Sequence, residues 1–181
     1  MGNLIIQLTR SIAVLPILAM GLTSPFVSAG IFQPSLDGSM NIAQVQTVAE
    51  KNVLSERAEM IDAYFKERSM PLYGFGEKMV KEADLHKIDW RLLPAIAVRE
   101  SSGGKQSCGY NPFGWASCDV AFKSYNESIE VLATNLGGDN PNTAKYYSGG
   151  TELKLHHYNG TVIASYTGEV LAIMDSIGPK Y

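Results

Sequence analysis

A continuous apolar run in the middle of the chain limits the possible folds more than any other feature of the sequence. Residues 90–102, WRLLPAIAVRESS, have helical spacing and too many apolar residues for a surface helix. Their continuous apolar surface is made of Leu92, Leu93, Ile96 and Ala97. We therefore predict a helix in the core, with Asp89 as its N-cap and with Pro94 in its second turn, where it removes one backbone hydrogen bond and bends the helix.

Further helices are predicted where apolar residues recur at helical spacing and a glycine or a turn follows. The expected helical segments are residues 43–67, 77–87, 125–138, 143–147, 151–160 and 165–177. The part before Leu54 has weaker apolar content, which favours a separate helix or a frayed approach to the first one. With 181 residues, 45% of them hydrophobic, the chain suits one domain. The expected fold class is mainly α, with a short loop or small hairpin, closed by the two cysteines, within residues 103–123.

The N-terminal segment resembles a secretory signal. Residues 1–29 contain one charged residue, Arg10, ahead of an apolar stretch, and they end in small residues at Val27, Ser28 and Ala29. The alternative is an uncleaved membrane anchor, which the short apolar run disfavours because a spanning helix needs about 20 residues. We expect a signal peptide over residues 1–29, a flexible leader over 30–42 and the folded domain over 43–181, with a secreted, periplasmic or cell-envelope location.

The charge balance argues against a nucleic-acid partner. The chain holds 15 Lys and Arg against 18 Asp and Glu, and removal of residues 1–29 takes away only Arg10. A mildly acidic protein has no broad basic face for a phosphate backbone. Contact with a membrane is expected only through residues 1–29, if they are retained.

The two cysteines, Cys108 and Cys118, lie close together in the exported part. One disulfide is the simplest interpretation, and in the chain-entropy model it contributes about 3 kcal/mol. Two free thiols are the alternative, which export disfavours. A zinc site is not expected, because the three histidines supply no paired ligand pattern, and we predict no metal and no cofactor.

Glu100 stands at the C-terminal end of the predicted central helix, one turn after Ile96 and Ala97. Loss of water and the negative end of the helix dipole both favour a neutral carboxyl group there. A neutral carboxylic acid can donate a proton to a leaving oxygen. The alternative is a solvated helix end, where Glu100 pairs with Arg91, Arg99 or Lys105.

Three short motifs in order resemble those of the lysozyme-like peptidoglycan glycosidases, in particular the Bax-like and glucosaminidase branch. In LLPAIAVRESSGGKQSCGYNPFGWASC, residues 92–118, a helix ends in Glu-Ser and an Asn-x-Phe-Gly element follows. HHYNG, residues 156–160, is similar to the Tyr-Asn motif shared with the soluble lytic transglycosylases, and EVLAIMDSIG, residues 169–178, resembles their closing helix. The resemblance covers residues 57–178 and implies a fold class that is mainly α (α+β lysozyme-like).

The resemblance implies roles for the matching residues. Glu100 takes the place of the general acid that protonates the glycosidic oxygen between amino sugars. Tyr158 is the second implied catalytic residue, and its side chain is expected to face Glu100. The implied substrate-binding residues are Ser101, Ser102, Asn111, Phe113, Gly114, Trp115 and Asn159. Large apolar residues such as Phe113 and Trp115 more often belong to the core, but their place in the cysteine loop beside the acid favours sugar contacts. Packing alone is the alternative for Tyr158.

Only one carboxylate stands in a recognisable motif, although glycosidases commonly use two. Asp119, directly after Cys118, is the nearest candidate for the second. Glu100 suffices alone if it returns as the base and the substrate supplies the nucleophile, through a muramic acid hydroxyl or an N-acetyl group. Hydrolysis and lytic transglycosylation both remain open.

The sequence therefore predicts a monomeric exported enzyme that cleaves the N-acetylglucosamine/N-acetylmuramic acid backbone of peptidoglycan. Two alternatives from other classes remain. One is a catalytically silent peptidoglycan-binding module, and the other is an envelope scaffold that acts through the helix at residues 43–67.

Overall fold

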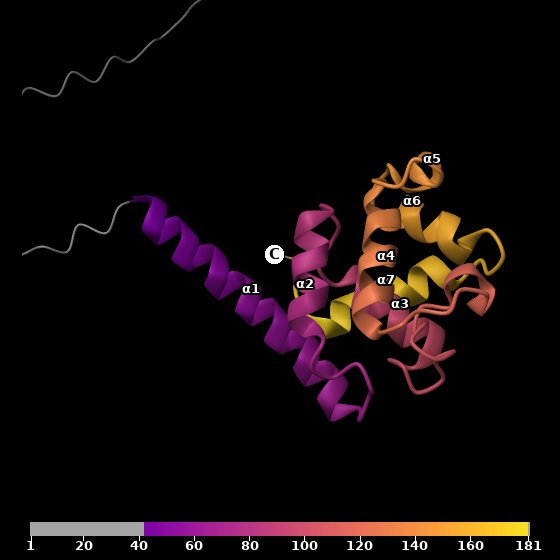
Figure 1. The fold of residues 1–181 in the computed structure, drawn as a ribbon, viewed down its shortest axis with the longest axis horizontal. Helices are drawn as coiled ribbons and strands as arrows, with labels where there is room; N and C mark the ends of the chain where they lie inside the picture. Colours follow the sequence, from indigo (N-terminus) through magenta and orange to yellow (C-terminus); the bar gives the residue numbers. More distant parts are fainter. Residues whose placement is uncertain (1–41, 181) are drawn as a thin grey trace, which may run out of the picture. The chain divides into compact units, whose positions relative to one another are not determined.

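Helix α3 occupies the centre of the computed structural model, which describes residues 42–180. Figure 1 shows the helices in chain order. The described elements are α1 (Ile42–Glu67), α2 (Gly76–Leu85), α3 (Leu92–Ser101), the 3-10 turn η1 (Trp115–Cys118), α4 (Tyr125–Gly137), α5 (Ala144–Tyr147), α6 (Thr151–Leu155), the π-helical turn η2 (His156–Gly160) and α7 (Tyr166–Ile177). The predicted mainly helical fold is confirmed. The predictions for residues 1–29 and 30–41 lie outside the described residues.

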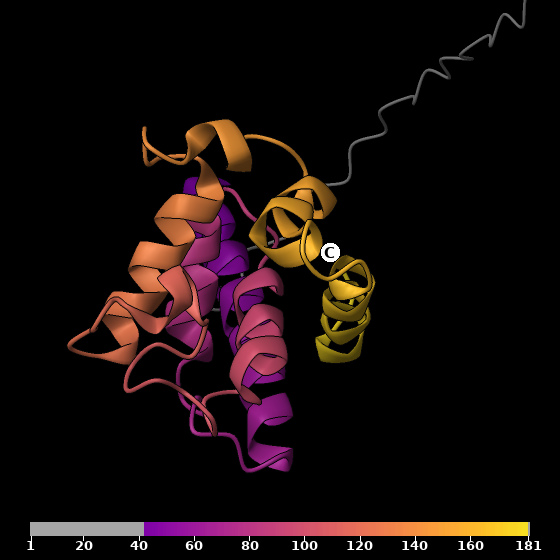
Figure 2. The ribbon, with the colours of Figure 1, turned by 90° about the vertical axis from the view of Figure 1, so that its right-hand side faces the viewer.

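Helix α3 is buried because other helices pack around it. Residues 92–97 are all buried, and α3 contacts α2, α4 and α7. Figure 2 shows α7 beside α3, with α4 on the other side. The prediction of a core helix from the apolar run is therefore confirmed, and the chain enters the core just before it reaches Glu100.

Two details at the start of α3 differ from the prediction. The helix begins at Leu92, so Asp89 lies outside it, and its carboxylate accepts a hydrogen bond from the Arg91 backbone N–H at 3.0 Å. Pro94 is the third residue of the helix and not a second-turn residue. The first N–H groups of a helix have no intrahelical partner, so the expected loss of a hydrogen bond at Pro94 was wrong.

Helix α1 is one continuous helix of 26 residues. Residues 46–53 are exposed, and in Figure 1 this half lies apart from the other helices. The second half packs on α2 and buries Ala58, Ile61 and Phe65. The residues before Leu54 therefore continue α1, and the prediction of a separate helix or a frayed approach there was wrong. Among the helices of residues 42–180, none is long and apolar enough to cross a membrane.

The segment between α3 and α4 is a stapled loop and not a hairpin. Cys108 and Cys118 form the predicted disulfide, with their Cα atoms 6.0 Å apart. The only pairing of strand type within the described residues is an isolated bridge between Cys108 and Asn111. Of the two predicted forms of residues 103–123, the loop is present and the hairpin is not.

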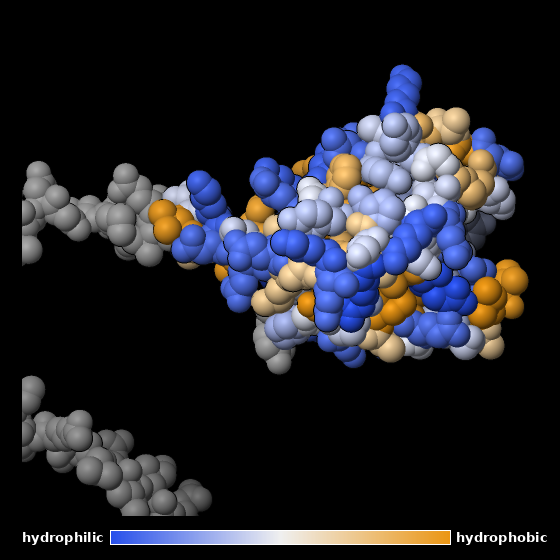
Figure 3. Space-filling model, turned by 90° about the horizontal axis from the view of Figure 1, so that it is seen from below, coloured by the Kyte–Doolittle hydropathy of each residue, from blue (hydrophilic) through white to orange (hydrophobic). Residues whose placement is uncertain are grey.

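Hydrophobic residues at the surface are scattered. On the face drawn in Figure 3, hydrophilic residues surround separate groups of hydrophobic ones. Of the most exposed large apolar side chains, Val162 (81%) lies between η2 and α7, and Leu85 (68%) is the last residue of α2. Single apolar residues of this kind are normal on a soluble surface.

A buried lysine joins three C-terminal elements. The Lys154 ammonium donates hydrogen bonds to the carbonyl of Leu136, at 2.6 Å, and to that of Tyr147. Burial lowers the pKa of Lys154, and the charge of Asp139 acts in the opposite direction. Because these carbonyls belong to the last turns of α4 and α5, Lys154 holds both helix ends against α6.

Candidate active site

Glu100 lines a pocket of about 270 Å³ at the C-terminal end of α3. The side chain is half-buried and is the only acidic one among the lining residues. The others are Gly114, Trp115, Ala116, Ser117, Tyr158 and Asn159. The stapled loop therefore supplies one wall of the pocket, and η2 supplies the other.

The two oxygens of the Glu100 carboxyl group have different surroundings. Oε1 accepts a hydrogen bond of 2.7 Å from the hydroxyl of Tyr166, the first residue of α7. Oε2 faces Gly114, where a Cβ atom would lie only 3.2 Å away. Gly114 also has a φ of +61°, which favours glycine. The Gly114 backbone thus approaches the carboxyl group more closely than a residue with a side chain could.

The basic residues near Glu100 are engaged elsewhere. The polar contacts are Arg91 with Asp89, Asp175 and the Gly178 carbonyl, Arg99 with Glu169, and Lys105 with the Arg68 carbonyl. In the part of the chain that the structure describes, no Lys, Arg or His nitrogen lies within 4.0 Å of a Glu100 oxygen. The alternative of an ion pair at a solvated helix end does not describe this site.

Two stacked tyrosines lie beside Glu100, of which Tyr158 lines the pocket and Tyr166 is fully buried. The rings of Tyr158 and Tyr166 are 6.1 Å apart and nearly parallel, at 13°. Burial raises the pKa of both phenols, and the nearby Glu100 carboxylate raises it further. Both hydroxyls therefore stay protonated at neutral pH and act as hydrogen-bond donors. Tyr166 donates to Glu100, and Tyr158 donates to the Phe113 carbonyl at 2.7 Å.

These raised pKa values predict a loss of stability in alkali. A phenol with a higher pKa in the folded state contributes stability below its unfolded value of 10.0, and that contribution is lost as the pH rises above it. We expect the free energy of unfolding to fall by about 1.4 kcal/mol per pH unit above pH 10 for each tyrosine. Lys154, whose pKa is lowered, opposes this trend only below pH 10.5.

Urea unfolding of the wild type and of Tyr166→Phe at pH 10, 11 and 12 measures the effect. The slope should be shallower in the variant by about 1.4 kcal/mol per pH unit. Equal slopes would contradict a buried neutral phenol at residue 166. Tyr73→Phe is the control, because Tyr73 is 51% exposed.

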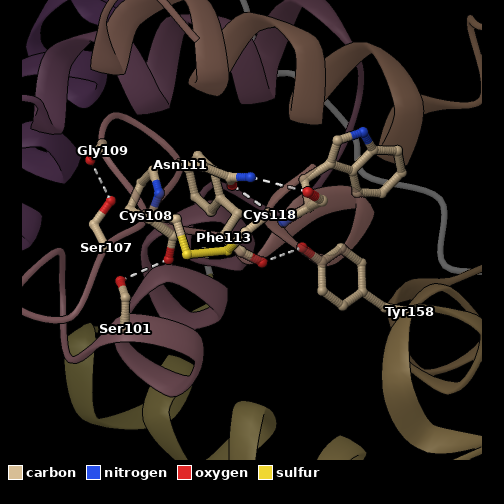
Figure 4. Close-up of a disulfide and its surroundings, with 10 residues drawn as sticks. Ser101, Ser107, Cys108, Gly109, Asn111, Phe113, Cys118 and Tyr158 are labelled. Carbon is tan, nitrogen blue, oxygen red and sulfur yellow. Dashed lines mark hydrogen bonds between the residues drawn. A yellow bond between two sulfur atoms is a disulfide. The ribbon is translucent and has the colours of Figure 1, made fainter. Parts of the chain in front are cut away.

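Three predicted substrate-binding residues use their side chains inside the protein. The Ser101 hydroxyl lies 2.6 Å from the Pro112 carbonyl and accepts a hydrogen bond from the Gly104 N–H at 3.0 Å. Asn111 is 1% exposed and bonds to both the backbone N–H and the carbonyl of Trp115. Phe113 has no exposed surface. Figure 4 shows these side chains fastening the stapled loop. They position the loop and do not face the pocket.

The other predicted residues divide between the pocket and its surroundings. Tyr158, Asn159, Gly114 and Trp115 line the pocket, as noted above. Tyr158 reaches from η2 across to the loop (Figure 4). Ser102 is the left-handed C-cap of α3, with φ +55°, and is not a lining residue. Asp119 is exposed beside the disulfide and is also absent from the pocket lining, so it stands outside the site that contains Glu100.

Sequence reasoning missed Tyr166. Tyr166 contacts Glu100 although it lies 66 positions later in the chain, and no local sequence pattern connects the two residues. A usable signal was present: Tyr166 begins an apolar helix, and a buried tyrosine needs a partner for its hydroxyl. Ala116 and Ser117 were also missed, because their place in the pocket depends on the path of the loop.

Within residues 42–180, no three His, Cys, Asp or Glu residues lie close enough to hold a metal ion. Comparison of the chain with family models, curated proteins and solved structures found no match. The sequence motifs and the surroundings of Glu100 are therefore the basis for a functional proposal.

Proposed function

We propose that this protein is an exported, lysozyme-like glycosidase that cleaves the glycan backbone of peptidoglycan, with Glu100 as its general acid and base. One observation carries the proposal: a half-buried carboxyl group without a basic partner lines a pocket, and a neutral tyrosine hydroxyl holds one of its oxygens. A structural acid at a helix end would pair with a cation or with water and would need no such support.

The proposed chemistry uses the second oxygen of Glu100. In the first step the carboxyl group gives its proton to the glycosidic oxygen, and the bond from that oxygen to the anomeric carbon breaks. The resulting carboxylate then takes a proton from the nucleophile that attacks the same carbon. Tyr166 is a positioning residue in both steps, since its hydroxyl fixes the orientation of the carboxyl group.

The nucleophile is proposed to come from the substrate. Glu100 is the only acidic lining residue, and Asp119 lies outside the lining, so the pocket offers no second carboxylate. A muramic acid hydroxyl that attacks its own anomeric carbon gives an anhydro sugar. Attack by the N-acetyl oxygen followed by water gives a reducing end.

Mass spectrometry of the material released from purified peptidoglycan tests the proposal. The exported part, residues 30–181, should release soluble muropeptides, and Glu100→Gln should not. Anhydro ends would identify lytic transglycosylation, and reducing ends would identify hydrolysis and the cleaved bond. If the wild type binds peptidoglycan and releases nothing, the enzyme proposal fails and a sugar-binding module remains.

Replacing Tyr166 with phenylalanine is expected to lower kcat about ten- to hundredfold and to leave KM nearly unchanged. A hydrogen bond to a charged group contributes about 1.5–3 kcal/mol, and here it acts on the orientation of the acid. Initial rates of muropeptide release at several substrate concentrations measure both constants. A Tyr166→Phe enzyme with full kcat would show that the hydroxyl has no part in positioning Glu100.

A further inference from the structure

The pocket around Glu100 is small for a polymer. Pockets that enclose a small ligand have volumes of about 300–1,000 Å³, and this one holds about 270 Å³. A glycan chain that places one linkage beside Glu100 must therefore rest its neighbouring sugars outside the pocket. The question is which surface next to the pocket has the chemistry to bind them.

A row of aromatic rings begins in the pocket and leaves it over α5 and η2. Its members come from three elements, η1, α5 and η2. The separations between ring centroids are 5.9 Å for Tyr158 and Trp115, 6.3 Å for Trp115 and Tyr147, 6.5 Å for Tyr147 and Tyr146, and 5.7 Å for Tyr146 and His157. Each ring therefore contacts the next one in the row.

The outer end of the row is accessible. Tyr146 is 43% exposed and His157 is half-buried, whereas Tyr147 beneath them is only 6% exposed. Lys154 fixes the Tyr147 carbonyl, so the end of α5 is held in place. Tyr146, the neighbour of Tyr147 in α5, is therefore an exposed ring on a backbone that is held in place, as a binding surface requires.

We propose that Tyr146 and His157 form a second sugar-binding site, continuous with the pocket, for the sugar units that follow the cleaved linkage along the chain. This inference rests on the proposed function. The apolar faces of pyranose rings pack on aromatic rings, and a fixed tyrosine gives a large contact area at a small entropic cost. The site would make the protein prefer long glycan strands to short ones.

The η2 turn contributes residues both to the pocket around Glu100 and to the second site. Tyr158 and Asn159 line the pocket, and His157, their neighbour in the same turn, contacts Tyr146 outside it. A sugar chain that leaves the pocket across η2 would therefore meet the rings of His157 and Tyr146 next. The row also has no acidic member that would repel the carboxylates of peptidoglycan stem peptides.

Calorimetric titration of Glu100→Gln, which should bind without cleaving, tests the inference. The probes are a disaccharide and a hexasaccharide prepared from peptidoglycan strands freed of their stem peptides. The hexasaccharide should bind more tightly. Adding Tyr146→Ala or His157→Ala should weaken hexasaccharide binding about tenfold and leave disaccharide binding unchanged.

Tyr73→Ala is the matched control, because Tyr73 is an exposed tyrosine with a lysine ammonium near its ring, as Tyr146 is. It should change neither affinity. Unaltered hexasaccharide affinity in both Tyr146→Ala and His157→Ala would overturn the second site and leave the proposed function standing. No binding of either probe, together with no release of muropeptides by the wild type, would overturn the proposed function itself.

Discussion

Replacing Glu100 with glutamine is expected to lower the rate of glycan cleavage about 10²- to 10⁴-fold while leaving glycan binding nearly unchanged. Glutamine has the same shape and can still accept a hydrogen bond from Tyr166, so the pocket should keep its form. It cannot give a proton to the glycosidic oxygen. The change therefore removes the acid and leaves the contacts with the sugar.

Rates of muropeptide release and titration with intact glycan strands measure the two effects. Asp119→Asn is the matched control, because Asp119 is a nearby acid that does not line the pocket. It should retain the wild-type rate. A large loss in Asp119→Asn would contradict the single-carboxylate mechanism, and an active Glu100→Gln would contradict the role of Glu100.

Replacing Phe113 with alanine is expected to lower the free energy of unfolding by about 3–5 kcal/mol. Phe113 has no exposed surface and belongs to the hydrophobic core, although its neighbours in the stapled loop border the pocket. Truncation removes the contacts of the ring and leaves a cavity beneath the loop. The backbone carbonyl that accepts the Tyr158 hydrogen bond would move with the loop, so pocket geometry should suffer as well.

Urea unfolding with the disulfide intact measures this loss. Phe113→Leu is the control, because a change of apolar shape in a core costs less than about 1.5 kcal/mol. If Phe113→Ala lost less than about 1 kcal/mol and yet bound glycan poorly, Phe113 would be a substrate contact after all. The experiment thus separates the two interpretations that the sequence left open for this residue.

The helices could be predicted from sequence because their signals are local. The apolar run of α3 required burial on all sides, and no arrangement of its neighbours could have placed it at the surface. The position of Glu100 at the end of that run also follows from helical periodicity, whereas its proposed role rests on the resemblance of the neighbouring motifs. The disulfide could also be predicted, because only two cysteines occur and they are close in sequence.

The directions of side chains in the stapled loop could not be predicted. Positive φ angles occur at four residues of this loop, Gly114, Ala116, Ser117 and Cys118. Only the glycine is a residue type for which a positive φ would be predicted from the sequence. That path turns Asn111 and Phe113 inward and brings the loop backbone to Glu100. The contact with Tyr166 was missed for a different reason, since it depends on how α7 packs on α3.

Chemical modification of Lys154 can measure how often the junction of α4, α5 and α6 opens. Its amine is buried and donates to two carbonyls, whereas Lys145, nine residues earlier, is exposed. An acylating reagent can modify Lys145 in the native protein but can reach Lys154 only after this junction opens. The ratio of the two modification rates would therefore report how often the support beneath the aromatic row comes apart, in a molecule that is otherwise folded.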